Sequence, residues 1–97
     1  MSADSQYYLD LLRSPQLLER LAAIEHDRWA HWQHYMHSRG TVGPDGSLTI
    51  PAELVERWSA QMSTPYEELP EEQRESDREQ VRRYLPVLEE AFSPQER

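Results

Sequence analysis

The sequence predicts a small, mainly α-helical domain of about four helices, with a short β-hairpin or extended loop near residues 41–50. Length is the first observation behind this prediction, because 97 residues suit one domain with a single core. The second is that apolar residues recur at helical spacing over several stretches, and that Ser, Thr, Pro and Gly signals separate these stretches. No repeat or low-complexity linker divides the chain, so we expect one domain over residues 1–97.

The first half of the chain predicts two helices. A short one is expected at about residues 5–13, and we expect residues 1–14 to be peripheral to the domain. Ser14 followed by Pro15 is typical of an N-cap with proline at the first helical position. The helix that these residues open should run over residues 15–38 and close at Gly40.

The middle of the chain changes its pattern. The Pro-Asp-Gly sequence at residues 44–46 lies between short β-prone pieces and indicates a turn. A third helix should start near Pro51 and carry its apolar residues on one side. Thr64 and Glu67 have the spacing of a capping box, which would open a short turn over residues 65–69.

The last helix is expected to begin after Pro70. Glu71 and Glu72 would lie in its first turn, where acidic side chains suit the helix macrodipole. We expect Pro86 to kink or interrupt this helix, because proline lacks the amide hydrogen that the next turn needs. Residues 93–97 would form a tail.

The composition excludes several classes of protein. The chain has 18 acidic and 10 basic residues, a net charge of -8, and no cysteine. An acidic surface is unfavourable for a protein that binds duplex nucleic acid, and no apolar run is long enough to cross a membrane. We therefore expect a soluble cytoplasmic protein. Leu, Ile, Val and Phe account for only 18 residues, so the fold should be modestly stable and helped by a ligand or by self-association.

Charged residues interrupt the apolar side of the long helix. In projection at about 100° per residue, Glu25 and Arg28 fall within a face of leucines and aromatic residues. Charges in such a place must be paired or must serve a ligand. Both interpretations stay open, an ion pair between residues three apart and a ligand-facing role.

The final helix repeats this pattern. Its apolar face, extended backwards, runs through Asp77 and Arg74. This end of the helix would either project into solvent or meet the charges of the long helix. In the second case the charged residues would form a small-ligand pocket walled by aromatic side chains. The candidate residues of this pocket are Glu25, Arg28, Trp29, Trp32, Tyr66, Arg74 and Asp77.

Signals for catalysis or for a metal are weak. His34 and His37 are three residues apart, without the spacing and intervening glutamate of a helical zinc site. The sequence also lacks a strained nucleophile turn and a glycine-rich phosphate loop. We therefore expect a non-enzymatic protein with no metal and no cofactor.

Two segments resemble the RyR domain, the repeat of ryanodine receptors. Residues 21–30 contain a His-x-x-Trp-Ala core, and residues 64–77 are similar to the family pattern Pro-aromatic-x-x-Leu-Pro-Glu, followed by a basic residue and then Asp or Asn. Arg39-Gly40 replaces the Gly-Trp that usually ends the first helix of the family, and residues 48–62 form a helix-like insertion. The residues that carry the match are His26, Trp29, Tyr66, Arg74 and Asp77.

The resemblance implies a compact α-helical binding module of the solitary prokaryotic or phage type. Such a module would recognise a nucleotide-derived molecule, a cyclic nucleotide or an ADP-ribose-type signal, as a sensor or as a phage sequestering protein in bacterial defence. Arg28 and Arg74 would hold phosphate, and Glu25 or Asp77 would accept hydrogen bonds. One of Trp29, Trp32 and Tyr66 would stack on the base. The same motifs could instead encode helix packing, with Arg74 and Asp77 as a structural clasp.

Two other functions compete with ligand binding. The segment over residues 67–79 carries seven acidic residues and two arginines, so it could face a basic protein partner. Alternatively, Trp58 and Met62 would be exposed on the third helix and would bury in a symmetric interface of a homo-oligomer.

Overall fold

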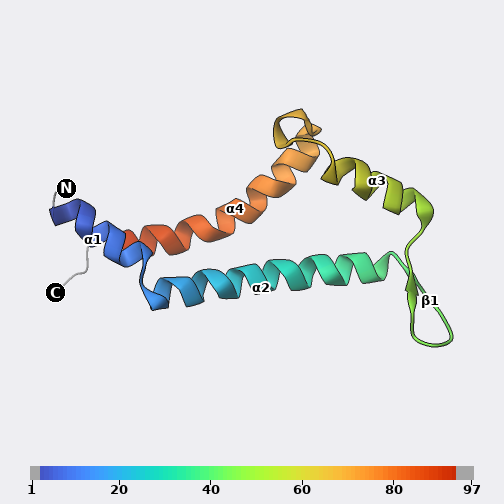
Figure 1. Ribbon diagram of the computed structural model, residues 1–97, viewed down its shortest axis with the longest axis horizontal. Coiled ribbons are helices and arrows are strands. Elements are labelled where there is room, and N and C mark those ends of the chain that lie inside the picture. Colours follow the sequence, from blue (N-terminus) through green and yellow to red (C-terminus); the bar gives the residue numbers. More distant parts are fainter. Residues whose placement is uncertain (1–2, 94–97) are drawn as a thin grey trace. The chain divides into compact units, whose positions relative to one another are not determined.

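A computed structural model describes residues 3–93 and shows a mainly α-helical protein with a small hairpin, which confirms the predicted fold class (Figure 1). Met1, Ser2 and residues 94–97, which include most of the predicted tail, lie outside the described residues. The elements in chain order are α1 (Ala3–Leu12), α2 (Pro15–Ser38), β1 (Thr41–Val42), β2 (Leu48–Thr49), α3 (Ala52–Met62), the 3-10 helix η1 (Tyr66–Glu68) and α4 (Glu71–Phe92).

The chain forms two compact units, and the divisions between them fall inside α2 and α4. The first unit comprises the described residues of Met1–Arg28 and Arg78–Arg97, and the second comprises Trp29–Asp77. Leu17 is the buried apolar residue of the first unit, whereas Leu54 and Leu69 are buried in the second. The expectation of a single domain stays a prediction.

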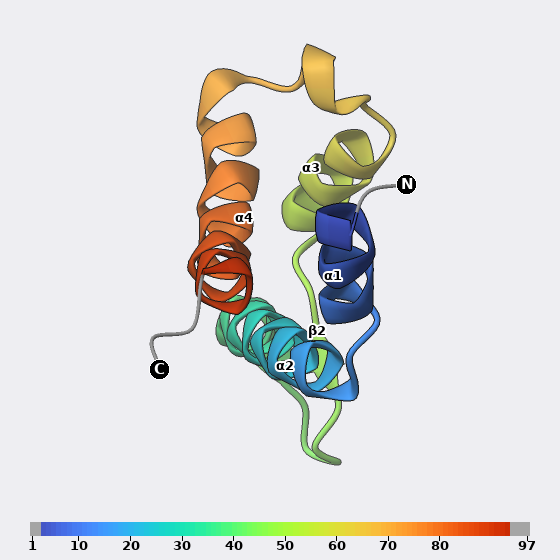
Figure 2. The same cartoon turned by 90° about the vertical axis from the view of Figure 1, so that its left-hand side faces the viewer.

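In the first unit, α1, the start of α2 and the end of α4 lie side by side (Figure 2). Ser14 caps α2 as predicted, because its Oγ accepts a hydrogen bond from the amide of Leu17 at 3.1 Å. The Arg20 guanidinium pairs with Glu90 at 2.8 Å, and the Tyr84 hydroxyl bonds to Glu25 further along α2. The later residue of α2, Glu25, contacts the earlier residue of α4, Tyr84, so the two helices are antiparallel here.

The apolar side of α2 is only partly covered. Leu17 is buried and Leu21 and Ile24 are half-buried, but Leu18 is 65% exposed. The rings of Tyr8 on α1 and Phe92 on α4 meet edge to face with centroids 5.6 Å apart. Aromatic contacts of this kind supply part of the packing that the few aliphatic residues do not.

In the second unit, β1 and β2 form the predicted hairpin. They pair antiparallel, with Thr41 opposite Thr49 and Val42 opposite Leu48. The turn closes through a 2.7 Å hydrogen bond from the Gly43 amide to the Ser47 carbonyl. Gly46 has φ of 86°, a conformation that favours glycine, and Asp45 accepts a hydrogen bond from the Ser47 amide at 3.0 Å.

The segment after the hairpin corrects one prediction. Helix α3 begins after Pro51 as expected, but Thr64 does not cap the next helix. Its hydroxyl instead donates to the Ala60 carbonyl at 2.6 Å, near the end of α3, and the N-cap residue of η1 is Pro65. The predicted capping box is therefore wrong. The carbonyls at the end of α3 lack helical partners, and the Thr64 hydroxyl bonds to one of them and does not cap η1.

Helix α4 corrects one of the two alternatives predicted for Pro86, an interruption of the helix, whereas a kink stays a prediction. It runs without interruption from Glu71 to Phe92, with Pro86 inside it. A proline in this position removes only the hydrogen bond to the carbonyl of Arg82, and the helix continues on both sides of that loss. The predicted start after Pro70, with Glu71 and Glu72 in the first turn, is confirmed.

Candidate functional site

Glu25 and Arg28, the charged pair predicted within the apolar face of α2, form an ion pair. The Arg28 Nη2 pairs with one carboxylate oxygen of Glu25, and its Nε donates to the other at 3.2 Å. Both side chains are about half exposed. The two N–H groups thus hold the carboxylate in a two-point contact, the geometry that suits guanidinium and carboxylate best. Of the two interpretations left open by the sequence, the ion pair is present, and a ligand-facing role stays a prediction.

Tyr84 adds a third group to this pair. Its hydroxyl donates a hydrogen bond to Glu25 from α4, within the same unit. The Arg28 guanidinium and then the Tyr84 hydroxyl lower the pKa of Glu25 from 4.5 to about 2. In return the carboxylate raises the pKa of Tyr84 above 10.0 and that of Arg28 above its ordinary value. Glu25, Arg28 and Tyr84, called the carboxylate cluster below, therefore keep their ordinary charge states near neutral pH.

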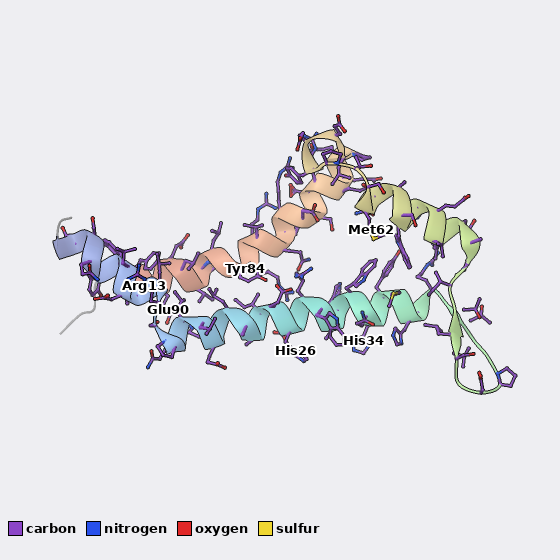
Figure 3. The ribbon with its side chains drawn as sticks, in the orientation of Figure 1. Arg13, His26, His34, Met62, Tyr84 and Glu90 are labelled. Atoms are coloured by element: carbon purple, nitrogen blue, oxygen red, sulfur yellow. The ribbon has the colours of Figure 1, made fainter. Side chains whose placement is uncertain are left out.

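His26 lies on the other side of the same helix turn. Figure 3 shows its side chain projecting from α2 away from the side that Tyr84 approaches. The residue is exposed. His26 is therefore not part of the carboxylate cluster, although the resemblance to the RyR domain included it in the candidate site.

Arg74 and Asp77 lie in the first two turns of α4. The Nη2 of Arg74 pairs with Glu71 at 2.8 Å, and its Nε is shielded from solvent without a hydrogen-bond partner among the described residues. Asp77 is exposed. Both residues belong to the second unit, whereas Glu25 and Arg28 belong to the first. The pocket between these two charged pairs stays a prediction.

Three aromatic rings gather in the second unit. Trp32 and Tyr35 on α2 have ring centroids 5.7 Å apart, and Trp58 on α3 meets Trp32 edge to face at 5.2 Å and Tyr35 at 6.5 Å. Trp32 is 41% and Tyr35 44% exposed, and Trp58 is half-buried. These three residues, called the aromatic cluster below, hold one another in place while leaving ring surface open to solvent.

The other two predicted aromatic residues are also exposed. Trp29 presents more than half of its surface from α2, and Tyr66 nearly half of its surface from η1. Of the aromatic residues predicted to wall the pocket, Trp32 is the one placed in the aromatic cluster.

Sequence reasoning missed Tyr84 and gave Trp58 a different role. Tyr84 is not among the predicted candidate residues, and Trp58 is predicted at an interface between copies. Both residues lie on the side of their helix that contacts α2. The sequence feature that could have identified them is an aromatic residue among the apolar residues of that side. Helical spacing shows which residues share one side of a helix, but it does not show which other helix packs against that side.

Two general findings concern the described residues alone. No helix among them has the combination of length and hydrophobicity that a bilayer span needs. Nor do three or more histidine or acidic side chains in residues 3–93 gather as metal ligands would.

Comparison with known proteins finds no matching family model, no matching curated protein and no matching solved structure. The resemblance to the RyR domain stays a prediction.

Proposed function

We propose that this chain is a non-enzymatic binding module that recognises a nucleotide-derived small molecule, a cyclic nucleotide or an ADP-ribose-type signal. The observation that carries the proposal is the aromatic cluster. Its rings are held by mutual contacts at 5.2 to 6.5 Å, and those of Trp32 and Tyr35 are more than 40% exposed. Large aromatic surfaces that stay open to water in a small domain mark a binding site more often than scattered single residues do.

A nucleobase suits this surface. Base–aromatic stacking contributes roughly 1–3 kcal/mol per base and tolerates any base, because every base has a π-face. A ring already fixed by its neighbours loses little conformational entropy when it stacks. The resemblance of residues 21–30 and 64–77 to the RyR domain supports the same ligand class. Within that proposal, the module acts as a sensor or as a phage protein that sequesters a signal in bacterial defence.

The test is a thermal-shift panel of cyclic mono-, di- and trinucleotides, ADP-ribose, cyclic ADP-ribose isomers and NAD. A ligand at a hundredfold excess over its Kd should stabilise the folded protein by about 2.7 kcal/mol, a rise of roughly 10–20 °C in the melting temperature of so small a protein. A shift confined to one nucleotide class supports the proposal. A flat panel contradicts it.

A second candidate function, binding of a basic protein partner, rests on a different observation. The segment over residues 67–79 carries seven acidic residues, and Arg74, one of its two arginines, is already paired with Glu71. Seven acidic residues against two arginines leave a net charge of -5 on this segment, which suits a basic protein partner. Charge reversal at Glu72 and Glu75 should then weaken capture of that partner, and the interaction should weaken steeply with salt. Equal capture by the E72K/E75K variant would contradict this second function.

A further inference from the structure

The chain contains one long segment without acidic residues. No carboxylate side chain lies between Asp27 and Asp45, although the protein has 18 of them. The segment includes Trp32 and Tyr35 of the aromatic cluster, together with three histidines and two arginines. In a protein of net charge -8, this segment contributes no carboxylate of its own that would repel a bound anion.

Arg39 lies in this segment, next to the aromatic cluster in the helical pattern. It follows Ser38, the last residue of α2, and its amide bonds to the Met36 carbonyl at 3.1 Å, so the backbone is still turning at Arg39. Arg39 stands four residues after Tyr35 and seven after Trp32. Extended one residue past the end of α2, this helical spacing puts Arg39 on the same row as these two rings.

Arg39 also differs from the arginines proposed first. Arg28 is paired with Glu25, and Arg74 is paired with Glu71. A phosphate that binds either residue must displace a carboxylate that already occupies its N–H groups. Within residues 3–93, the exposed side chain of Arg39 forms no ion pair, so its full guanidinium edge is available.

One other arginine of the second unit is without an ion pair in the described part of the chain, namely Arg57 on α3. Its own helix carries Glu53 one turn before it and Glu56 beside it. These carboxylates oppose an anion at Arg57. Arg39 has no acidic residue within five positions of it in the sequence, and this distinguishes it from Arg57.

We propose that Arg39 is the phosphate-binding residue of a nucleotide site in the second unit, with the base stacked on the aromatic cluster. The proposal rests on the proposed function and replaces Arg28 and Arg74 as the phosphate ligands. The chemical class of ligand is a nucleoside phosphate, because stacking requires a planar ring and the guanidinium fork requires an oxyanion. Arg39 and the three rings all belong to one unit, so the site needs no contribution from the other.

Isothermal titration of ADP-ribose, cyclic di-AMP and cyclic di-GMP tests the proposal on wild type and on the R39A, R28A and R74A variants. R83A is the matched control, because Arg83 is also exposed and free of ion pairs within residues 3–93 but belongs to the first unit. We expect R39A to weaken binding about tenfold or more, and R83A to bind as wild type does. R39K should fall between them, since it keeps the charge and loses the fork.

The outcomes separate the two proposals. Binding that survives in R39A but is lost in R28A or R74A overturns the assignment of Arg39 and leaves the proposed function standing. Wild-type protein that binds none of the three nucleotides overturns the assignment of Arg39, whereas the proposed function is overturned only by a flat thermal-shift panel. Circular dichroism melts of every variant show that a loss of binding is not a loss of fold.

Discussion

At the scale of single residues, the carboxylate cluster shows how a charge is accommodated in an apolar helix face. Glu25 lies among half-buried apolar residues of α2, and Arg28 on the same helix and Tyr84 on α4 both bond to it. The sequence predicted the Arg28 contact, because residues three apart on a helix are neighbours. It could not predict Tyr84, because nothing in helical spacing says which residue of another helix faces Glu25.

The first prediction concerns acid stability. The pKa of Glu25 is lowered from 4.5 to about 2, so its contribution to stability is present above about pH 4.5 and is lost as the pH falls toward 2. The E25Q variant lacks this contribution at every pH. Thermal melts from pH 6 to 2 should therefore fall more steeply for wild type than for E25Q. E90Q serves as the control, since Glu90 pairs with Arg20 on the exposed surface. Parallel profiles for wild type and E25Q would contradict the role of Glu25.

The second prediction concerns the phenol of Tyr84. Its hydroxyl donates to Glu25, which raises its pKa above the ordinary 10.0. Ultraviolet titration of wild type minus the Y84F variant isolates this one tyrosine from the other four. The midpoint should lie above pH 10.0, and it should return toward 10.0 in E25Q. A midpoint at or below 10.0 in wild type would show that the hydrogen bond does not form in solution.

At the scale of elements, cap and breaker residues predicted the helices well. Ser14 and Pro15 gave the start of α2, and the Gly43–Gly46 turn gave the hairpin. The two errors have a common cause. Thr64 bonds to the end of α3 and not to the start of η1, and α4 continues through Pro86 where an interruption was one of the two predicted outcomes. Local sequence identifies a capable residue, but competition among backbone groups decides what it does.

The third prediction tests the cap of α2. Ser14 Oγ accepts from the Leu17 amide, so removal of this oxygen should cost about 1 kcal/mol. The S14A variant should therefore melt roughly 4–8 °C lower than wild type. S14D supplies another capping oxygen and should melt near wild type. A melting temperature for S14A equal to that of wild type would show that the cap adds nothing.

The fourth prediction tests the core of the second unit. Leu54 is 2% exposed on α3, whereas its neighbour Val55 is 48% exposed. L54A should cost about 2–5 kcal/mol in urea unfolding, because it loses buried surface and leaves a cavity. V55A is the matched control and should cost well under half as much. Near-ultraviolet circular dichroism should show that L54A also disturbs the aromatic cluster, because Trp58 lies on α3 one turn after Leu54. Equal costs for the two variants would contradict the assignment of this core.

At the scale of the whole molecule, the main features are the net negative charge and the large exposed apolar side chains. The low aliphatic content predicted a modest core, and in residues 3–93 the buried apolar residues, Leu17, Leu54 and Leu69, agree with that expectation. The candidate site was predicted in part. Helical spacing identified Trp32 and the Glu25–Arg28 pair, but it could not bring Trp58 beside Trp32, because that contact joins residues 26 positions apart through a hairpin. Contacts of this kind depend on turn geometry rather than on periodicity.

The fifth prediction concerns salt. A net charge of -8 on 97 residues disfavours the folded state through self-repulsion, whereas exposed ion pairs such as Arg82–Glu79 contribute little. Sodium chloride screens both effects, and relief of the repulsion should prevail. The melting temperature should rise by a few degrees between low and moderate ionic strength. A fall in melting temperature would instead show that the ion pairs outweigh the repulsion.

The hairpin tip has a practical consequence for anyone handling this protein. A Cβ placed on Gly46 would meet no atom within 4 Å, and the turn closes below it through the bond between Gly43 and Ser47. An epitope or a dye-bearing loop inserted after Asp45 would therefore extend into solvent from a base that is already tied together. Since the chain has no cysteine, one cysteine introduced in such an insertion would be the sole thiol. The tip thus offers a single addressable handle for surface immobilisation or fluorescence measurements, remote in sequence from the carboxylate cluster.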